Sequence, residues 1–260
     1  MNSNPGYIPL NERLAHKCFQ QPDSHKSKVW RYMNLAKLIS LISEKRLYLT
    51  RLDKLIDDPH EGTLSKYTIN GIKSFAISQN WDDKPVLDQL MKHYHKNRAT
   101  TYVCCWHMNE QESEAMWRLY CGINNGHGVA IQTTYSHLLK AIETESDVYI
   151  GCVRYFDPTS EPQDINALCA AMYKRNAFIH EKEIRMVISP GELRKTDNIE
   201  HSPESWLIPW DSAQLIEQIY IDPCSPDYIA KAIKTVINAI APELSKKIKD
   251  SHLKEAPFFP

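Results

Sequence analysis

The chain has 260 residues, of which 42% are hydrophobic and 24% charged, and its formal net charge is -1. This balance is typical of a globular protein, and the near-neutral charge provides no broad electrostatic surface for DNA or RNA. No apolar run approaches the roughly 20 residues that cross a bilayer, and the N-terminus lacks the basic start and apolar core of a secretory signal. The sequence therefore predicts a cytoplasmic protein without a membrane partner.

The seven cysteines form an odd set without a CxxC pair, so the closely spaced ligands of a zinc knuckle are absent. Cys104 and Cys105 lie in an apolar run, where buried free thiols are expected. We therefore predict reduced, structural cysteines, in keeping with a reducing compartment.

The sequence of the N-terminal half predicts an irregular arm over 1–27 with a short helix around 10–18. Alternating short strands and helices are expected after the arm. Asn34 is placed to cap a helix whose apolar residues recur at helical spacing from Leu35. The turn-forming run Asp57–Gly62 interrupts the chain, and a helical stretch follows to about Asn97. The predicted strands are 28–33, 46–50 and 101–106, and the candidate core contacts of the helical stretch are Trp81, Leu87, Leu90 and Tyr94.

The C-terminal half continues the same mixture without the regular alternation of a doubly wound fold. Helices are expected over 112–120, 136–143, 166–180 and 227–240, strands over 129–132, 147–155, 181–188 and 216–221, and a turn over 124–128. The fold expected is a single mixed α+β domain over 28–260, with a largely antiparallel or mixed sheet flanked by helices. Neither GxGxxG nor GxxxxGK[ST] occurs, so two common phosphate-binding loops are absent.

The segment 181–188 has the most informative pattern. In a strand, Glu181, Glu183 and Arg185 would share one face, while Ile184 and the later apolar residues would face the core. The charged face is compatible with a solvent-exposed side of an antiparallel sheet. It is equally compatible with a carboxylate pair that acts as a base or stabilises a cationic transition state.

Other polar positions offer weaker candidates. Arg31 lies between two aromatic residues and suits either a structural ion pair or a phosphate contact. The cluster Asp57, Asp58, His60 and Glu61 contains metal-type ligands, but no partner elsewhere is identifiable, so we assign no metal site and favour a turn. The aromatic residues Trp106, Trp117 and Tyr120 are expected in the core, with a stacking platform as the alternative.

Several segments in order resemble the bacterial domain-of-unknown-function family 2971. The resemblance covers about residues 28–240. It rests on Trp30-Arg31-Tyr32, Leu47-Tyr48-Leu49, Asp57-Asp58-Pro59-His60-Glu61, Cys105-Trp106, Met116 to Tyr120, Gly126 to Ile131, Lys174, Glu181, Glu183, Arg185 and Ile219-Tyr220-Ile221. The chain departs from the family pattern at His60, where Phe is usual, and at Phe178, where Trp is expected.

The layout is also similar, more distantly, to that of ADP-ribosyltransferases. That resemblance implies NAD as a substrate, Glu183 as the catalytic carboxylate and Glu181 as the residue that orients the acceptor. It implies Arg31 as the contact to the NAD phosphates and Thr50 as the hydroxyl residue, with Tyr32 and Arg185 as further cofactor contacts.

Three functions are therefore carried forward. The first is an NAD-dependent ADP-ribosyltransferase-like effector, toxin or phage-defence protein, which would bind a small nucleotide and modify a protein or nucleic-acid acceptor. The second is a non-enzymatic sensor or interaction module in bacterial defence. The third is a metal-dependent nuclease, which would rest on Asp57, Asp58, His60 and Glu61.

Overall fold

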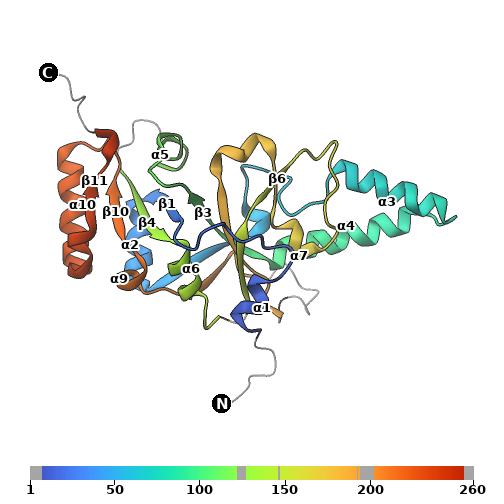
Figure 1. Ribbon diagram of the computed structural model, residues 1–260, viewed down its shortest axis with the longest axis horizontal. Coiled ribbons are helices and arrows are strands. Elements are labelled where there is room, and N and C mark those ends of the chain that lie inside the picture. Colours follow the sequence, from blue (N-terminus) through green and yellow to red (C-terminus); the bar gives the residue numbers. More distant parts are fainter. Residues whose placement is uncertain (1–7, 122–126, 146, 192, 194–201, 255–260) are drawn as a thin grey trace, which may run out of the picture. The chain divides into compact units, whose positions relative to one another are not determined.

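The computed structural model describes residues 8–121, 127–145, 147–191, 193 and 202–254. The chain divides into two compact units, and both contain strands and helices (Figure 1). The first unit consists of residues 1–22, 49–105 and 145–206, and the second of residues 23–48, 106–144 and 207–260. The predicted single domain over 28–260 stays a prediction.

The second unit is built on antiparallel strands. β1 (Lys28–Asn34) pairs along its whole length with β4 (Gly128–Thr134), and β4 pairs with β10 (Gln218–Ile221). The short strand β11 (Ile248–Asp250) adds to β10 in parallel, so the pairing is mixed. The predicted turn at 124–128 lies mostly outside the described residues, because the structure does not describe 122–126.

Helices cover these strands. The Asn34 side chain accepts a hydrogen bond from the Lys37 N–H at 2.9 Å, which confirms the predicted cap of α2 (Leu35–Glu44). The predicted helix 227–240 is confirmed as α10 (Asp227–Ile240), whose buried side chains recur at helical spacing. The remaining helical segments of this unit are α5 (Glu114–Cys121), α6 (Tyr135–Ala141), α9 (Ser212–Leu215) and the 3₁₀ turns Pro242–Lys247 and His252–Lys254.

The strands of the first unit position several charged residues, among them Glu183 and Arg185. β5 (Val148–Cys152) pairs antiparallel with β8 (Glu183–Ile188), and Gly151 lies opposite Arg185. A parallel pair joins β6 (Arg154–Phe156) to β7 (Tyr173–Arg175). Thr50 and Arg51 of β2 (Arg46–Arg51) pair with β3 (Tyr102–Met108), and β9 spans Ser205–Pro209. Both units thus confirm the α+β class with a largely antiparallel, mixed sheet flanked by helices.

The predicted helix over 166–180 is wrong. Only α7 (Ala167–Ala170) is α-helical, and the chain then pairs as β7 before the 3₁₀ segment Asn176–Glu181. The Arg154 N–H of β6 donates to the Met172 carbonyl at 2.7 Å. The backbone around Met172 therefore hydrogen-bonds to a strand that is distant in sequence instead of continuing the helix. Helical spacing of apolar residues carries no information about such a pairing.

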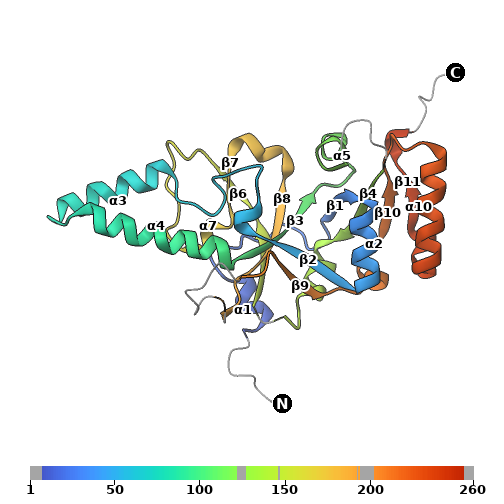
Figure 2. The same cartoon turned by 180° about the vertical axis from the view of Figure 1, so that it is seen from behind.

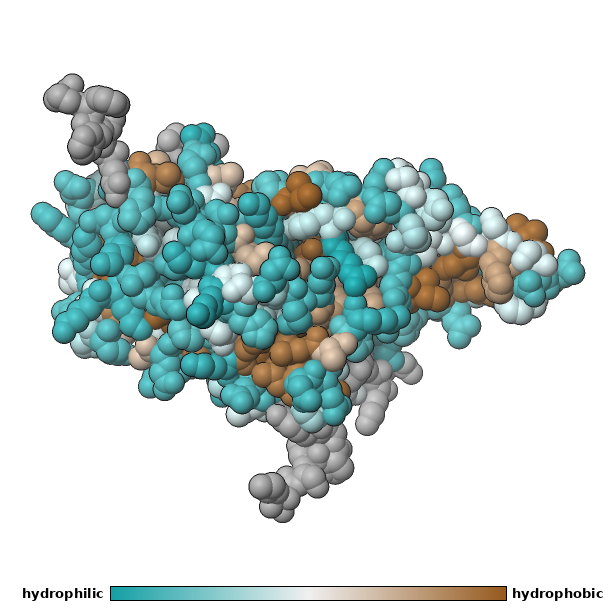
Figure 3. Space-filling view, viewed as in Figure 1, coloured by the Kyte–Doolittle hydropathy of each residue, from teal (hydrophilic) through white to brown (hydrophobic). Residues whose placement is uncertain are grey.

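Two helices, α3 (Lys66–Ser78) and α4 (Asp83–Thr100), form a hairpin that extends away from the strands of the first unit (Figures 1 and 2). Tyr94 is buried, as expected, and Leu90 packs against the same cluster. Trp81, in contrast, is 57% exposed, so its predicted place in the core is wrong. Apolar residues gather at the surface of the hairpin in Figure 3.

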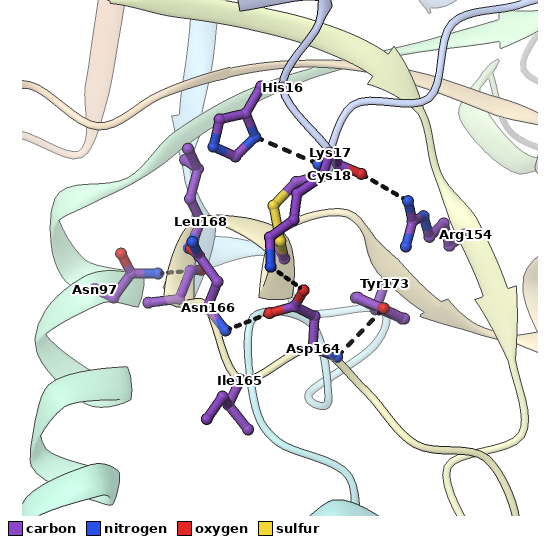
Figure 4. Close-up of a disulfide and its surroundings, with 12 residues drawn as sticks. His16, Lys17, Cys18, Asn97, Arg154, Asp164, Ile165, Asn166, Leu168 and Tyr173 are labelled. Carbon is purple, nitrogen blue, oxygen red and sulfur yellow. Dashed lines mark hydrogen bonds and ion pairs between the residues drawn. A yellow bond between two sulfur atoms is a disulfide. The ribbon is translucent and has the colours of Figure 1, made fainter.

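A disulfide joins Cys18 to Cys169 across 151 residues of sequence (Figure 4). The two Cα atoms lie 4.8 Å apart, and both side chains are buried. This finding corrects the prediction that all cysteines are reduced, because pairing at such a separation leaves no pattern in the sequence. Lys17 adds an ion pair to Asp164 at 2.7 Å, so residues 8–22 of the predicted N-terminal arm are fixed to the first unit. The cysteines outside this disulfide are Cys104, Cys105, Cys121, Cys152 and Cys224.

The remaining helical segments of the first unit are short. Those whose bounds the structure describes are α1 (Leu10–Leu14) and the 3₁₀ turn Leu52–Lys54. Within the described ranges, no helix has both the length and the apolar character that a membrane span requires.

Candidate functional site

Charged side chains from separate segments of the first unit meet in its interior. We call Glu61, Lys174, Glu181, Glu183 and Arg185 the buried charge cluster. Their side chains are at most 6% exposed. Burial of this many ionic groups costs free energy unless each has charged partners, so the contacts within the cluster decide what it can do.

The strand that carries the cluster begins later than predicted. Glu181 ends the 3₁₀ segment, Lys182 adopts a left-handed conformation with φ of 41°, and β8 starts at Glu183. All residues of β8 are buried, so the predicted solvent-facing alternative for its charged face is wrong. Glu183 and Arg185 do share one side of the strand, as the alternation predicts, since they form a side-chain ion pair.

Arg185 holds both oxygens of the Glu183 carboxylate. Its Nε donates to Oε1 at 2.6 Å and its Nη2 to Oε2 at 2.9 Å, while Nη1 donates to the Ala171 carbonyl at 2.6 Å. Nη2 also lies 2.6 Å from Oε2 of Glu61, although that oxygen accepts no hydrogen bond of good geometry. The two-point contact between Arg185 and Glu183 is the strongest kind of ion pair that a guanidinium and a carboxylate form.

Lys174 contacts all the carboxylates of the cluster. Its Nζ lies 2.9 Å from a carboxylate oxygen of Glu181, 3.3 Å from Oε1 of Glu61 and 3.4 Å from Oε2 of Glu183. The Phe178 ring lies 4.9 Å from the same ammonium group, where its π face favours a cation. The ammonium group therefore has carboxylates and an aromatic face around it instead of water.

The electrostatics keep Glu183 ionised. Burial raises the pKa of Glu183, but the nearby charges of Arg185 and Lys174 outweigh burial and hold this pKa at about 2. Burial also raises the pKa of Glu61, and there the cations do not fully compensate. With two cations facing three carboxylates, a proton on Glu61 would bring the cluster to electrical balance.

Two neighbours of Glu183, Tyr155 and Cys105, were not predicted from the sequence. The Glu183 N–H donates to the Tyr155 hydroxyl at 2.9 Å, and a hydrogen bond from the Cys105 thiol further lowers the pKa of the Glu183 carboxyl. Burial raises the pKa of that thiol well above its usual value, so it stays protonated as a donor. Neither contact leaves a local pattern in the sequence, because both partners lie far from Glu183 along the chain.

The loop Asp57–Gly62, which contains the metal-type ligands, contributes Glu61 to the buried charge cluster. Asp58 is 1% exposed and forms a two-point ion pair with Arg175, at 2.9 Å to Nη2 and 3.2 Å to Nε. Gly62, with φ of 71°, turns the chain directly after Glu61. Because Asp58 and Glu61 already face cations, they are poorly placed as metal ligands, and within the described ranges no three His, Cys, Asp or Glu side chains are arranged to hold a metal.

The space beside the cluster is small. A hollow lined in part by Asp58, Lys174 and Arg175 has a volume of about 10 Å³, which is room for about one water molecule. Glu183 is 3% exposed and Arg185 is fully enclosed. As arranged here, the predicted catalytic carboxylates face their ion partners instead of a ligand cavity.

The other predicted cofactor contacts are divided between the two units. Arg31 and Tyr32 belong to the second unit, whereas Glu181, Glu183, Arg185 and Thr50 belong to the first. The Arg31 guanidinium lies 5.9 Å from the Trp106 ring and donates to the Tyr48 carbonyl at 3.3 Å.

Tyr32 belongs to the core of the second unit. Its hydroxyl accepts the Ser113 N–H at 2.8 Å, and burial raises its pKa. Trp106 and Trp117 are buried as expected, while Tyr120 is 43% exposed. Thr50 pairs through its backbone with Val103.

The chain was compared with protein families, curated proteins and solved structures. No protein-family model matches the chain, and neither a curated protein nor a solved structure matches it.

Proposed function

We propose that this protein acts by binding a macromolecular partner, and that the buried charge cluster stabilises the first unit instead of performing catalysis. Binding is supported by the exposed apolar side chains of the α3–α4 hairpin, among which Phe75, Ile77 and Trp81 are more than half exposed. The two-point contact between Arg185 and Glu183, in which both carboxylate oxygens accept hydrogen bonds, argues against catalysis by Glu183. A carboxylate that stabilises a cationic sugar must present an oxygen to that sugar. Glu183 is 3% exposed and both of its oxygens face buried cations, so a sugar reaches neither oxygen unless the cluster opens.

Opening the cluster is costly. Removing one partner of a buried ion pair leaves an uncompensated charge and destabilises proteins by about 3–5 kcal/mol. Glu61 and Lys174 would lose their contacts together with Glu183, because all three share partners. A dinucleotide would have to displace these pairs and enter a space with room for about one water molecule.

NAD turnover measured alongside stability tests the proposal. We expect the wild-type protein to release no nicotinamide from NAD, and we expect Glu183→Gln to lower the melting temperature. The matched control is Glu204→Gln, because Glu204 pairs with Lys54 at the surface and its side chain is 75% exposed. Nicotinamide release by the wild type that a folded Glu183→Gln variant loses would overturn the proposal.

An NAD-dependent ADP-ribosyltransferase is the second candidate. The observation that favours it is the meeting of Glu181 and Glu183 at one point, with Glu183 held ionised at neutral pH, as a base or electrostatic stabiliser requires. Titration calorimetry with NAD tests this candidate. If the protein is a transferase, NAD should release heat on binding to the wild type, and Arg31→Ala and Glu183→Gln should both reduce that heat. If the protein acts by binding a macromolecule, NAD should release no heat with the wild type or with either variant.

A further inference from the structure

The α3–α4 hairpin carries an exposed set of apolar side chains. We define the hairpin patch as Tyr67, Phe75, Ile77, Trp81, Val86 and Met91, which are all at least 38% exposed. Three of them, Phe75, Ile77 and Trp81, expose more than half of their surface. Single exposed apolar residues are ordinary, but a group gathered on one projecting element marks an interaction surface (Figure 3).

Two aromatic residues of the patch, Phe75 and Trp81, contact each other. The Trp81 N–H donates to the Ala76 carbonyl at 2.9 Å, which returns the chain to the end of α3. Its ring meets the Phe75 ring edge-on at a centroid distance of 5.9 Å. A ring pair that is already in place loses little side-chain entropy when a partner covers it, which favours binding.

The hairpin does not need the patch for its own packing. Its interior is formed by buried Thr68, Ala76 and Tyr94 together with half-buried Ile72 and Leu90, and the Tyr94 hydroxyl donates to the Ile165 carbonyl at 2.7 Å. Substitutions at the exposed patch positions therefore leave these contacts intact.

The hairpin is basic although the protein is not. Residues 66–100 contain six Lys or Arg and three Asp, a formal charge of +3, which leaves -4 for the rest of a chain whose total is -1. Lys73 precedes Ile77 by four positions and Lys84 precedes Met91 by seven, so a cation and an apolar side chain share a helix face in both helices. Within the part of the chain that the structure describes, Lys73, Lys84 and Lys92 are exposed and form no ion pair.

We propose that the hairpin patch binds an acidic protein segment that presents apolar side chains between its Asp and Glu residues. This inference rests on the proposed binding function and names its partner class. The exposed lysines complement the acidic groups, while the apolar side chains of the patch cover those of the segment.

Three other occupants fit less well. A second copy would bring two hairpins of formal charge +3 together. An anionic membrane presents its charge over a continuous plane and would meet Asp82 and Asp83 beside Trp81, whereas a protein segment can place its Asp and Glu residues at the lysines. A single strand of nucleic acid would stack on Trp81 and Phe75, but it would leave the aliphatic Ile77, Val86 and Met91 without apolar partners.

Fluorescence anisotropy with a labelled synthetic peptide tests the inference. The probe is an 18-residue amphipathic helix with Glu on one face and Leu on the other, and the reference peptide has Lys in place of each Glu. We expect the acidic peptide to bind at least about tenfold more tightly than the basic one. We also expect this binding to weaken as ionic strength rises.

Two double variants separate the apolar and the charged contributions. Phe75→Gln/Trp81→Gln and Lys73→Glu/Lys92→Glu should each weaken binding of the acidic peptide by about tenfold or more. The matched control is Tyr228→Gln on α10, which removes an aromatic residue that is 69% exposed from another element and should change nothing. Circular dichroism and thermal melting establish that every variant is folded.

Each contrary result overturns the inference. Equal affinity for both peptides excludes charge complementarity, and full binding by either double variant excludes the hairpin. Tighter binding of a 20-nucleotide oligo(dT) or of phosphatidylserine vesicles assigns the patch to nucleic acid or membrane, and dimerisation lost in Phe75→Gln/Trp81→Gln assigns it to a second copy. NAD turnover by the wild type would contradict the proposed function while leaving these binding results unchanged, so the two failures are distinguishable.

Discussion

Arg185 and Glu183 are two residues apart on β8, and the guanidinium Nε and Nη2 donate to the two carboxylate oxygens at 2.6 and 2.9 Å. The pair lies in the core of the first unit, where Lys174 and Glu61 complete its contacts. It therefore links β8 to segments that are far apart in sequence.

Glu183→Gln should destabilise the protein strongly. The amide keeps the shape of the side chain but removes the charge, so Arg185 and Lys174 stay buried with less compensation. We expect a loss of about 3–5 kcal/mol in the free energy of unfolding. Urea unfolding followed by circular dichroism measures it, and a loss no larger than that of Glu204→Gln would show that the pair contributes nothing.

The Glu183 carboxyl should make the free energy of unfolding depend on pH in the acidic range. The folded pKa of Glu183 is about 2, below its usual 4.5, so the unfolded chain binds more protons between these values. Stability from this group is fully present above pH 4.5 and is lost as the pH falls towards 2, by about 3 kcal/mol. Unfolding free energies across this window should fall less steeply in Glu183→Gln than in the wild type. Equal slopes would contradict the lowered pKa.

Glu61 should show the opposite pH dependence. Burial raises its pKa above the usual 4.5, so the folded state binds more protons than the unfolded state once the pH exceeds that value. Its contribution to stability is therefore largest at low pH and declines as the pH rises past 4.5. Glu61→Gln should flatten this decline in urea unfolding between acidic and neutral pH. A decline as steep as that of the wild type would rule out a raised pKa.

Reduction of the Cys18–Cys169 disulfide should lower stability by about 2–4 kcal/mol, because the bond constrains a long loop in the unfolded chain. Thermal melting with and without dithiothreitol measures the change. Cys18→Ser should melt like the reduced protein, and the control Cys224→Ser, at an exposed free thiol, should melt like the wild type. Maleimide labelling of the unfolded, unreduced protein should modify five of the seven cysteines, and labelling of all seven would contradict the bond.

Two glycines should respond to alanine in opposite directions. At Gly62, φ is 71° and an added Cβ would lie 2.5 Å from Leu52 Cδ2, so Gly62→Ala should destabilise by about 1–3 kcal/mol and disturb the turn that carries Glu61. Gly71 is exposed within α3, and a Cβ there meets nothing within 4 Å. Gly71→Ala should therefore stabilise by about 0.5–1 kcal/mol. Equal effects in urea unfolding would show that the Gly62 turn is not strained.

Local chemistry in the sequence determined much of this protein. Asn34 marks the start of α2, the apolar spacing of 227–240 marks α10, and the composition of 28–33 marks β1, because capping, amphipathicity and strand preference act over a few residues. Alternation along β8 also placed Glu183 and Arg185 on one side.

Only the tertiary structure decided what those residues meet. Pairing with β6 turned part of a predicted helix into β7 and brought Lys174 against Glu181 and Glu183, and the same packing joined Cys18 to Cys169. It also left Trp81 in solvent, since the end of a projecting hairpin has no neighbouring layer to cover it. Such contacts depend on which distant segments share the interior, and no spacing within a single segment encodes that choice.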